Sequence, residues 1–193
     1  MKNIYLYTLT FATALAISSC SMTAETSLAS HALPLSGTDP LEDFVPAHNA
    51  VRSRHSLQPL RWSPQLASYA QQWADQLRRR NNCHMKHRPS KGRFAQQYGE
   101  NLLWVGPTRW SDGRLELYPM TPEMITDVWA DERRDYRYRS NSCKRGKICG
   151  HYTQVVWHDT QEIGCARAVC RDQSQLWVCN YNPPGNYRGK RPY

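Results

Sequence analysis

After its first twenty residues the chain has no apolar run long enough to cross a bilayer. Its seven cysteines include no Cys-x2-Cys pair, and the sequence shows no internal repeat. The missing pair argues against a zinc site built from thiolates. Without a repeat, 193 residues have room for one domain with a real hydrophobic core.

The N-terminal stretch MKNIYLYTLTFATALAISSC combines one charge, Lys2, with an apolar run that ends in small residues. This pattern predicts an export signal over residues 1–20. Its end, Ile17–Cys20, resembles a bacterial lipobox, in which the cysteine is lipidated and becomes the mature N-terminus. Ordinary cleavage nearby, for instance after Ala24, is the alternative. A lipid on Cys20 would tether the protein to a membrane surface without inserting it.

The composition divides the remaining chain into two parts. Residues 21–40 are rich in Ser, Thr, Ala and Pro without apolar periodicity, which predicts a linker. The domain is expected over residues 41–193. We therefore expect an exported protein that is either extracellular or a lipoprotein of the cell envelope.

The number of cysteines and the net charge narrow the class of protein and its possible partners. Without Cys20, six cysteines remain, and an even number in an exported chain predicts three disulfides. The formal net charge is +9. Nucleic acid is one partner for such a chain, but export argues against it. Anionic membrane, cell-wall polymer and plain solubility remain as explanations. The run Arg78–Arg80 suits the dipole at the end of an expected helix.

Helices are expected in the first two thirds of the domain, over residues 43–56, 63–81 and 121–137. Ser63 and Thr121 can cap the last two, each followed by proline at the first helical position. In the third helix apolar residues and one carboxylate recur every four positions, at Met124, Val128, Glu132 and Tyr136. A carboxylate on an inner face is costly unless it is paired or near water. Glu132 is therefore a candidate functional residue.

The last third of the chain has a different period. Residues 151–157, 162–170 and 175–182 are short, rich in β-forming residues and separated by polar turns, which predicts an antiparallel meander. Helices first and strands last predict an α+β fold with helices packed on the sheet.

Six motifs then occur in a fixed order, and together they resemble the CAP superfamily: cysteine-rich secretory proteins, antigen 5 and plant pathogenesis-related class 1 proteins. They are AHNAVR, CHMKH, YGENL, VWADERRDY, CGHYTQVVW and VCNYNPPGNY. The ending GNYRGKRPY is most similar to the plant class. The resemblance implies a three-layer α-β-α sandwich with a central antiparallel sheet. It also implies the disulfides Cys83–Cys170, Cys143–Cys149 and Cys165–Cys179.

The resemblance also implies a cleft lined by two histidines and two glutamates, which are here His87, Glu100, Glu132 and His151. Two neutral imidazoles can ligate zinc or another divalent ion, and carboxylates can hold its water or orient the imidazoles. The link between His87 and Glu100 is longer than in many plant members, so His84 is an alternative ligand. We expect Asn101, Tyr152 and Gln154 to support the site, a structural role for His48, and His55 and His158 at the surface.

The leading functional expectation is binding of a sterol, fatty acid or similar lipid, in host interaction or defence, by a monomer that has no nucleic-acid partner. Some family members bind sterol through the segment that is residues 103–120 here. It is unusually apolar for a loop because of Trp104, Trp110, Leu115, Leu117 and Tyr118. The alternative is that these side chains fold back on the core.

Two other functions remain open. A metal-dependent hydrolase of peptide or cell-wall material would use Glu100 and Glu132 as candidate catalytic residues. The resemblance implies no single reaction, so binding is favoured over turnover. The tail Pro183–Tyr193 also matches the part from which some plant members release a small defence peptide. A packing role for this tail is the favoured alternative.

Overall fold

The computed structural model describes residues 40–81 and 83–193. The predicted export signal, the lipidation of Cys20 and nearly all of the linker lie outside these residues. In the part that is described, no helix is long and apolar enough to cross a membrane.

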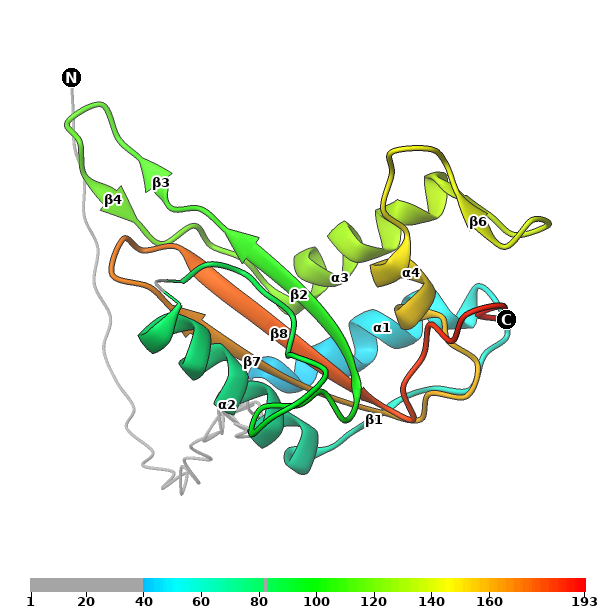
Figure 1. The fold of residues 1–193 in the computed structure, drawn as a ribbon. Helices are drawn as coiled ribbons and strands as arrows, with labels where there is room; N and C mark the ends of the chain where they lie inside the picture. The colour runs from blue at the N-terminus through cyan, green and yellow to red at the C-terminus, as the bar shows by residue number, and fades with distance from the viewer. Residues whose placement is uncertain (1–39, 82) are drawn as a thin grey trace, which may run out of the picture. The chain divides into compact units, whose positions relative to one another are not determined.

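The centre of the domain is a four-stranded sheet with the order β1-β7-β8-β2 (Figure 1). Its strands are β1 (Arg61–Trp62), β2 (Gly99–Val105), β7 (Glu162–Val169) and β8 (Gln175–Asn182). β8 pairs antiparallel with both β2 and β7, and only the short β1 runs parallel to its neighbour. The predicted central antiparallel sheet is confirmed, and β2 is one of its two edge strands.

Helices cover both faces of this sheet. α2 (Pro64–Arg80) packs on one face, where Ala70, Trp73 and Leu77 join side chains of β7 and β8 in one core cluster. α1 (Phe44–Ser53), α3 (Pro122–Ala130) and α4 (Gly150–Val155) contribute to a second cluster on the other face. The predicted three-layer α-β-α sandwich is therefore confirmed.

The close approach of α2 to the sheet depends on one glycine. A Cβ placed on Gly164 of β7 would lie 2.2 Å from the backbone nitrogen of Ala67 and 2.6 Å from the carbonyl carbon of Leu66. The first turn of α2 fills this space, with Ser63 as cap: its hydroxyl oxygen accepts a hydrogen bond from the N–H of Leu66. The predicted N-terminus of this helix is thus in place.

Four short strands and two 3₁₀ turns complete the fold. β3 (Thr108–Arg109) pairs with β4 (Leu115–Glu116), and β5 (Tyr136–Arg137) pairs with β6 (Ser142–Cys143). The turns are η1 (Pro40–Asp43) and η2 (Asp131–Arg134). The predicted third helix is therefore shorter than expected, and Glu132 lies in η2.

The strand predicted over residues 151–157 is wrong. The segment forms α4, and Val155 and Trp157 are not in the sheet. Its buried residues Tyr152, Val155 and Val156 follow helical spacing, so they reach the core from one helix face. Tertiary packing outweighs the strand preference of the adjacent valines.

The inner face predicted for the third helix is also wrong. Met124 and Val128 are 39% and 46% exposed. The buried face of α3 is formed by Ile125, Thr126 and Trp129. The step of four residues was correct for a helix, but the inner stripe begins one position later.

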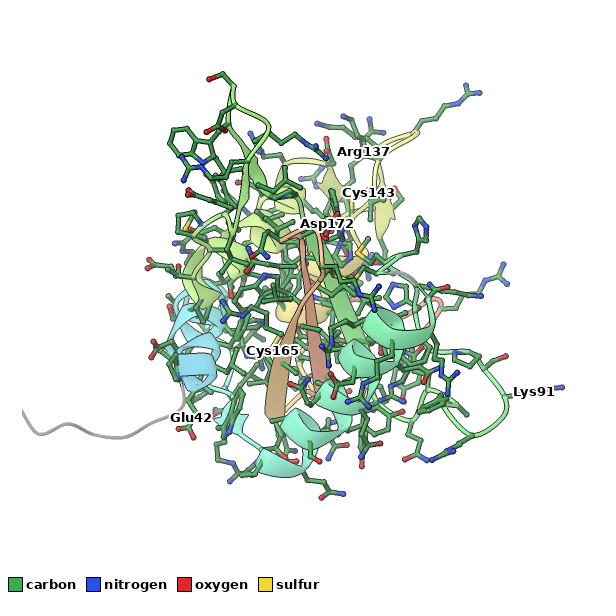
Figure 2. The ribbon with its side chains drawn as sticks, turned by 90° about the vertical axis from the view of Figure 1, so that its left-hand side faces the viewer. Glu42, Lys91, Arg137, Cys143, Cys165 and Asp172 are labelled. Carbon is green, nitrogen blue, oxygen red and sulfur yellow. A yellow bond between two sulfur atoms is a disulfide. The ribbon has the colours of Figure 1, made fainter. Side chains whose placement is uncertain are left out.

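All three expected disulfides are present. Cys83–Cys170 connects the segment after α2 to the residue after β7, and Cys143–Cys149 closes a short loop before α4. Cys165, which Figure 2 labels on β7, pairs with Cys179 directly opposite on β8. Cys83–Cys170 therefore ties the end of α2 to the sheet, and Cys165–Cys179 links two neighbouring strands within it.

Candidate functional site

His151 and Glu132 form the first of two histidine–glutamate pairs. The Nδ1 of His151 lies 2.6 Å from Glu132 Oε1. Glu132 Oε2 accepts hydrogen bonds from the backbone N–H of His151 at 3.0 Å and of Tyr152 at 3.1 Å. His151 therefore lies in the first turn of α4 and does not begin a strand. The carboxylate satisfies two of the N–H groups that a helix start leaves unpaired.

His87 and Glu100 form the second pair. The Nδ1 of His87 lies 2.9 Å from Glu100 Oε1, which also accepts a hydrogen bond from the backbone N–H of Arg88 at 3.0 Å. The side chain of Glu100 is fully buried, whereas that of His87 is 56% exposed. The longer link after His87 has not separated it from Glu100.

Arg88 compensates the buried charge of Glu100. Its Nε lies 3.6 Å from Glu100 Oε2, and its guanidinium lies 3.6 Å from the centre of the Tyr69 ring. The Arg88 NH2 group also donates to the Tyr69 carbonyl. Burial lowers the pKa of Arg88 from its usual value. The motif resemblance does not identify this residue, and its position directly after His87 is the only indication in the sequence.

The two pairs share one geometry. In each, a glutamate accepts from the histidine Nδ1 and from a neighbouring backbone N–H. Because an ionised carboxylate only accepts hydrogen bonds, Nδ1 carries the proton in a neutral imidazole. Nε2 is then left with a lone pair that can accept a proton or bind a metal.

Strand β2 connects the two pairs. Glu100 and Asn101 are neighbours on this strand, and Asn101 Nδ2 donates to the carbonyl of His151 at 3.1 Å. Trp129 stacks on the His151 ring at 6.2 Å and donates through Nε1 to the carbonyl of Leu102. No group of three or more His, Cys, Asp or Glu that could hold a metal occurs in residues 40–81 and 83–193. The structure thus joins the four residues as two pairs.

The expected supporting residues have different partners. Asn101 contacts the site directly, whereas Gln154 accepts from the backbone N–H of Gly185 and donates to Thr160. The Tyr152 hydroxyl contacts Tyr193 at 2.9 Å, and burial, followed by this hydrogen bond, raises its pKa well above the usual value. Gln154 and Tyr152 therefore position the C-terminal tail.

The remaining histidines have structural or surface environments. His48 is fully buried, donates through Nδ1 to the carbonyl of Phe44 and accepts through Nε2 from the Tyr181 hydroxyl. Its burial lowers its pKa to about 3. His84 and His158 are exposed. His55 is partly exposed, and its ring stacks on Tyr193 at 4.1 Å.

The apolar segment after YGENL is partly regular structure. Trp104 belongs to β2, and the rest includes the β3–β4 hairpin. Trp104, Trp110 and Tyr118 are 46%, 48% and 43% exposed, and Leu117 is 37% exposed. Trp110 is held by Glu116, which accepts from its Nε1 at 2.9 Å. These side chains have not folded back onto the core.

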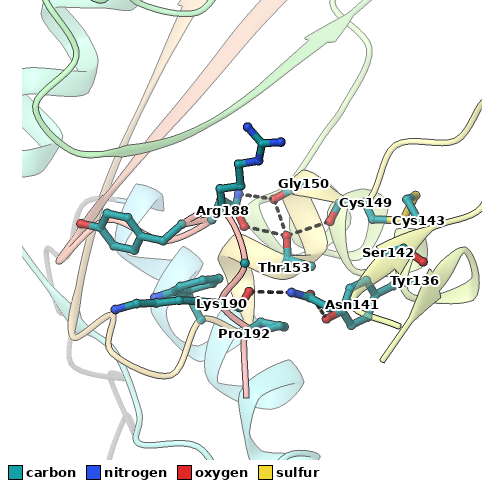
Figure 3. A pocket seen from close by; sticks show the side chains of 14 residues that line it. Tyr136, Asn141, Ser142, Cys143, Cys149, Gly150, Thr153, Arg188, Lys190 and Pro192 are labelled. Atoms are coloured by element: carbon teal, nitrogen blue, oxygen red, sulfur yellow. Dashed lines mark hydrogen bonds between the residues drawn. A yellow bond between two sulfur atoms is a disulfide. The ribbon is translucent and has the colours of Figure 1, made fainter. Parts of the chain in front are cut away.

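The C-terminal tail lines one side of a hollow of about 410 Å³ beside the Cys143–Cys149 loop (Figure 3). Asn141 donates to the carbonyl of Lys190, and Asn186 donates to the carbonyl of Gly150. Thr153 donates to the side-chain oxygen of Asn186. The tail is thus attached to α4 and to the β5–β6 region at several points.

Comparisons with known proteins agree with this architecture. The family model "CAP: Cysteine-rich secretory protein family" matches residues 45–181. Pathogenesis-related protein 1A of Nicotiana tabacum is 41% identical over 152 residues, which are 79% of this chain and 80% of that protein. Pathogenesis-related protein PR-1 of Medicago truncatula is 42% identical over 151 residues, which are 78% and 77% of the two chains.

Solved structures show the same fold. Venom allergen-like protein 4 of Schistosoma mansoni has a TM-score of 0.59 and 26% identity, over 81% of this chain and 94% of that one. NaASP2, solved with Zn²⁺, has a TM-score of 0.59 and 21% identity, over 81% and 86% of the two chains.

The α-β-α sandwich with its two histidine–glutamate pairs thus defines a CAP domain. The chain belongs to the cysteine-rich secretory protein family and resembles the plant pathogenesis-related class 1 proteins. Its family and its three disulfides indicate an extracellular protein. A lipid anchor on Cys20 stays a prediction.

Proposed function

We propose that the protein is a secreted, defence-related CAP protein that binds a sterol, a fatty acid or a similar lipid. The observation that carries this proposal is the exposure of Trp104, Trp110, Leu117 and Tyr118 along one segment. Large apolar side chains grouped at a surface are typical of binding sites. Tryptophan and tyrosine also combine an apolar body with a polar group, which suits an amphipathic ligand.

A hollow of about 440 Å³ supports the proposal. Its lining includes Met120, the last residue of this segment. Met120, Pro122 and Trp177 give it an apolar lining, Arg167 provides a positive charge, and Asp43 a negative one. The indole Nε1 of Trp177 is a buried donor without a hydrogen-bond partner in the described part of the chain. The volume of the hollow lies within the range of about 300–1,000 Å³ that is usual for ligand pockets.

These features fit a ligand with an apolar body and one oxygen-bearing end. The guanidinium of Arg167 lies 5.3 Å from the centre of the Trp177 ring, so one end of the hollow can donate hydrogen bonds. A carboxylate would bind the arginine more strongly than a hydroxyl would. We therefore expect a fatty acid to depend on Arg167 more than a sterol does.

Binding of radiolabelled cholesterol and palmitate to the purified protein tests this proposal. Trp110→Ala should weaken binding of both ligands, and Arg167→Gln should weaken palmitate binding more. Ile148→Ala is the matched control. Ile148 is 67% exposed, so its truncation removes apolar surface outside this segment. Saturable binding that survives Trp110→Ala would remove the segment from the proposal, and absence of saturable binding to the unaltered protein would reject lipid binding by it.

A divalent metal is a further part of the proposal. His87 and His151 would be its ligands through Nε2, because the glutamates occupy both Nδ1 atoms. Only two imidazoles are supplied in this way, so water or a ligand would complete the coordination. A bound zinc ion would polarise that water. Metal analysis after dialysis against zinc should show loss of the ion in His151→Ala and retention in His158→Ala.

The other two functions are not favoured by a particular contact. Hydrolysis by Glu100 and Glu132 stays a prediction, as does release of Pro183–Tyr193. The many hydrogen bonds of this tail support a packing role instead.

A further inference from the structure

A hollowed basic surface lies at the end of α2, away from the two histidine–glutamate pairs. Three hollows of about 660, 410 and 190 Å³ all include Arg80 in their lining. Arg79 lines the two larger ones. We call this surface the basic groove and define it by its cationic side chains: Arg78, Arg79, Arg80, Lys86, Arg93 and Arg171.

The positive charge of the basic groove is only partly compensated. Asp75 and Asp172 are the two carboxylates in its lining, so its formal charge is +4 of the +9 carried by the whole chain. Asp75 contacts Arg78 at 3.2 Å and Arg79 at 3.3 Å. Within residues 40–81 and 83–193, the other four cations form no ion pair with a protein carboxylate.

Three separate segments supply these cations. Arg78–Arg80 end α2, and a helix dipole accounts for positive charge there. It does not account for Lys86 and Arg93, which precede β2, or for Arg171 in the turn after β7. The Cys83–Cys170 disulfide ties the segment after α2 to this turn. The fold therefore holds like charges together, although their mutual repulsion is unfavourable.

We propose that the basic groove binds a linear acidic polysaccharide. Guanidinium groups form paired hydrogen bonds with carboxylates and sulfates. Hollows that share lining residues suit a chain of anions better than a single ion. The lining has no exposed aromatic side chain of the kind that enters a bilayer interface. An extracellular protein with disulfides also meets acidic glycans more readily than nucleic acid.

Calorimetric titration of the full-length protein with oligogalacturonate and with dextran sulfate tests this inference. The variant Arg80→Gln/Arg171→Gln removes two charges from the basic groove. The variant Arg137→Gln/Arg145→Gln removes two exposed arginines from the β5–β6 region, which lies at the other end of the molecule from the end of α2 (Figure 1). Net charge is therefore the same in both variants.

Loss of the two groove arginines should weaken glycan binding by about tenfold or more and lower its dependence on salt. The remote variant should change binding by less than about twofold, and circular dichroism should show both variants folded. Equal weakening in the two variants would overturn the inference, since net charge alone would then explain binding. Equally tight, groove-dependent binding of phosphatidylserine vesicles or single-stranded DNA would also overturn it, as would no glycan binding.

Discussion

Glu132 holds His151 at two points, through the imidazole Nδ1 at 2.6 Å and through the backbone N–H at 3.0 Å. The same carboxylate accepts from the N–H of Tyr152. One side chain from η2 therefore fixes both the start of α4 and the orientation of its histidine. This relationship explains why a glutamate is tolerated on a partly buried surface: its oxygens are paired with donors.

Glu132→Ala should lower the free energy of unfolding by about 2 kcal/mol. Three donors lose their acceptor in this variant, and each unpaired buried group costs about 1–3 kcal/mol unless water replaces the carboxylate. Urea denaturation at neutral pH measures the change. Asp127→Ala is the control, because Asp127 is exposed on α3 and should alter stability by less than about 0.5 kcal/mol. Equal effects of the two substitutions would contradict the assigned role of Glu132.

Arg88→Met should be more damaging, because it leaves the buried carboxylate of Glu100 without its neighbouring cation. Removing one partner of a buried ion pair costs about 3–5 kcal/mol. The double variant Arg88→Met/Glu100→Gln removes both charges and should regain part of that loss. Urea denaturation of the two single variants and the double variant gives the coupling between these side chains. Additive losses would show that Arg88 acts through its contacts with Tyr69 and not through Glu100.

The stability of the protein should fall as the pH drops below 6.5, and His48 should contribute to this fall. Burial lowers its folded-state pKa to about 3, against the opposing effect of the hydrogen bond to Phe44 and with a smaller lowering by Arg52, whereas the unfolded value is about 6.5. Between these values the unfolded chain binds the extra proton, so folding loses up to about 1.4 kcal/mol per pH unit from this group. The contribution is fully present above pH 6.5 and lost toward pH 3.

Urea unfolding at pH 7, 6 and 5 checks this prediction. His48→Gln removes the titrating group and should flatten the pH dependence, although its stability at pH 7 will be lower. His158→Gln should retain the slope of the unaltered protein, because His158 is exposed and paired only with Asp159. An unchanged slope in His48→Gln would show that carboxylates alone produce the acid instability.

Local features of the fold could be predicted from the sequence, and long-range ones could not. The caps Ser63 and Thr121 act within three residues, so their effect is visible in the sequence. The start of α4 depends on Glu132, which lies about twenty positions earlier in the chain. Strand preference was therefore the only local indication at residues 151–157, and it predicted the wrong element.

In the candidate site, too, long-range contacts could not be predicted from the sequence. The motif resemblance identified His87, Glu100, Glu132 and His151, and the structure joins them as two pairs. It could not identify Arg88, because the need for that cation arises only when β2 buries Glu100. The exposed position of Met124 and Val128 was also hidden, since two neighbouring stripes of α3 have the same spacing.

Tyr193 should stabilise the C-terminal tail through both its ring and its hydroxyl. The ring stacks on His55 and on Tyr138, and the hydroxyl contacts that of Tyr152 at 2.9 Å. Tyr193→Phe should cost about 1 kcal/mol, the typical value of one hydrogen bond. Tyr193→Ala should cost about 2 kcal/mol or more, because the stacking is lost too. Tyr187→Phe is the control, since Tyr187 is exposed and its hydroxyl has no hydrogen-bond partner in the described residues.

Thermal unfolding and limited proteolysis measure the two consequences of these substitutions. We expect Tyr193→Ala to speed cleavage within residues 183–193, because the side-chain contacts at the end of the tail are lost. Tyr193→Phe should keep the tail nearly as resistant as in the unaltered protein. If Tyr193→Ala melts and is cleaved like Tyr187→Phe, the tail is held by its backbone contacts with Asn141 and Thr160 instead.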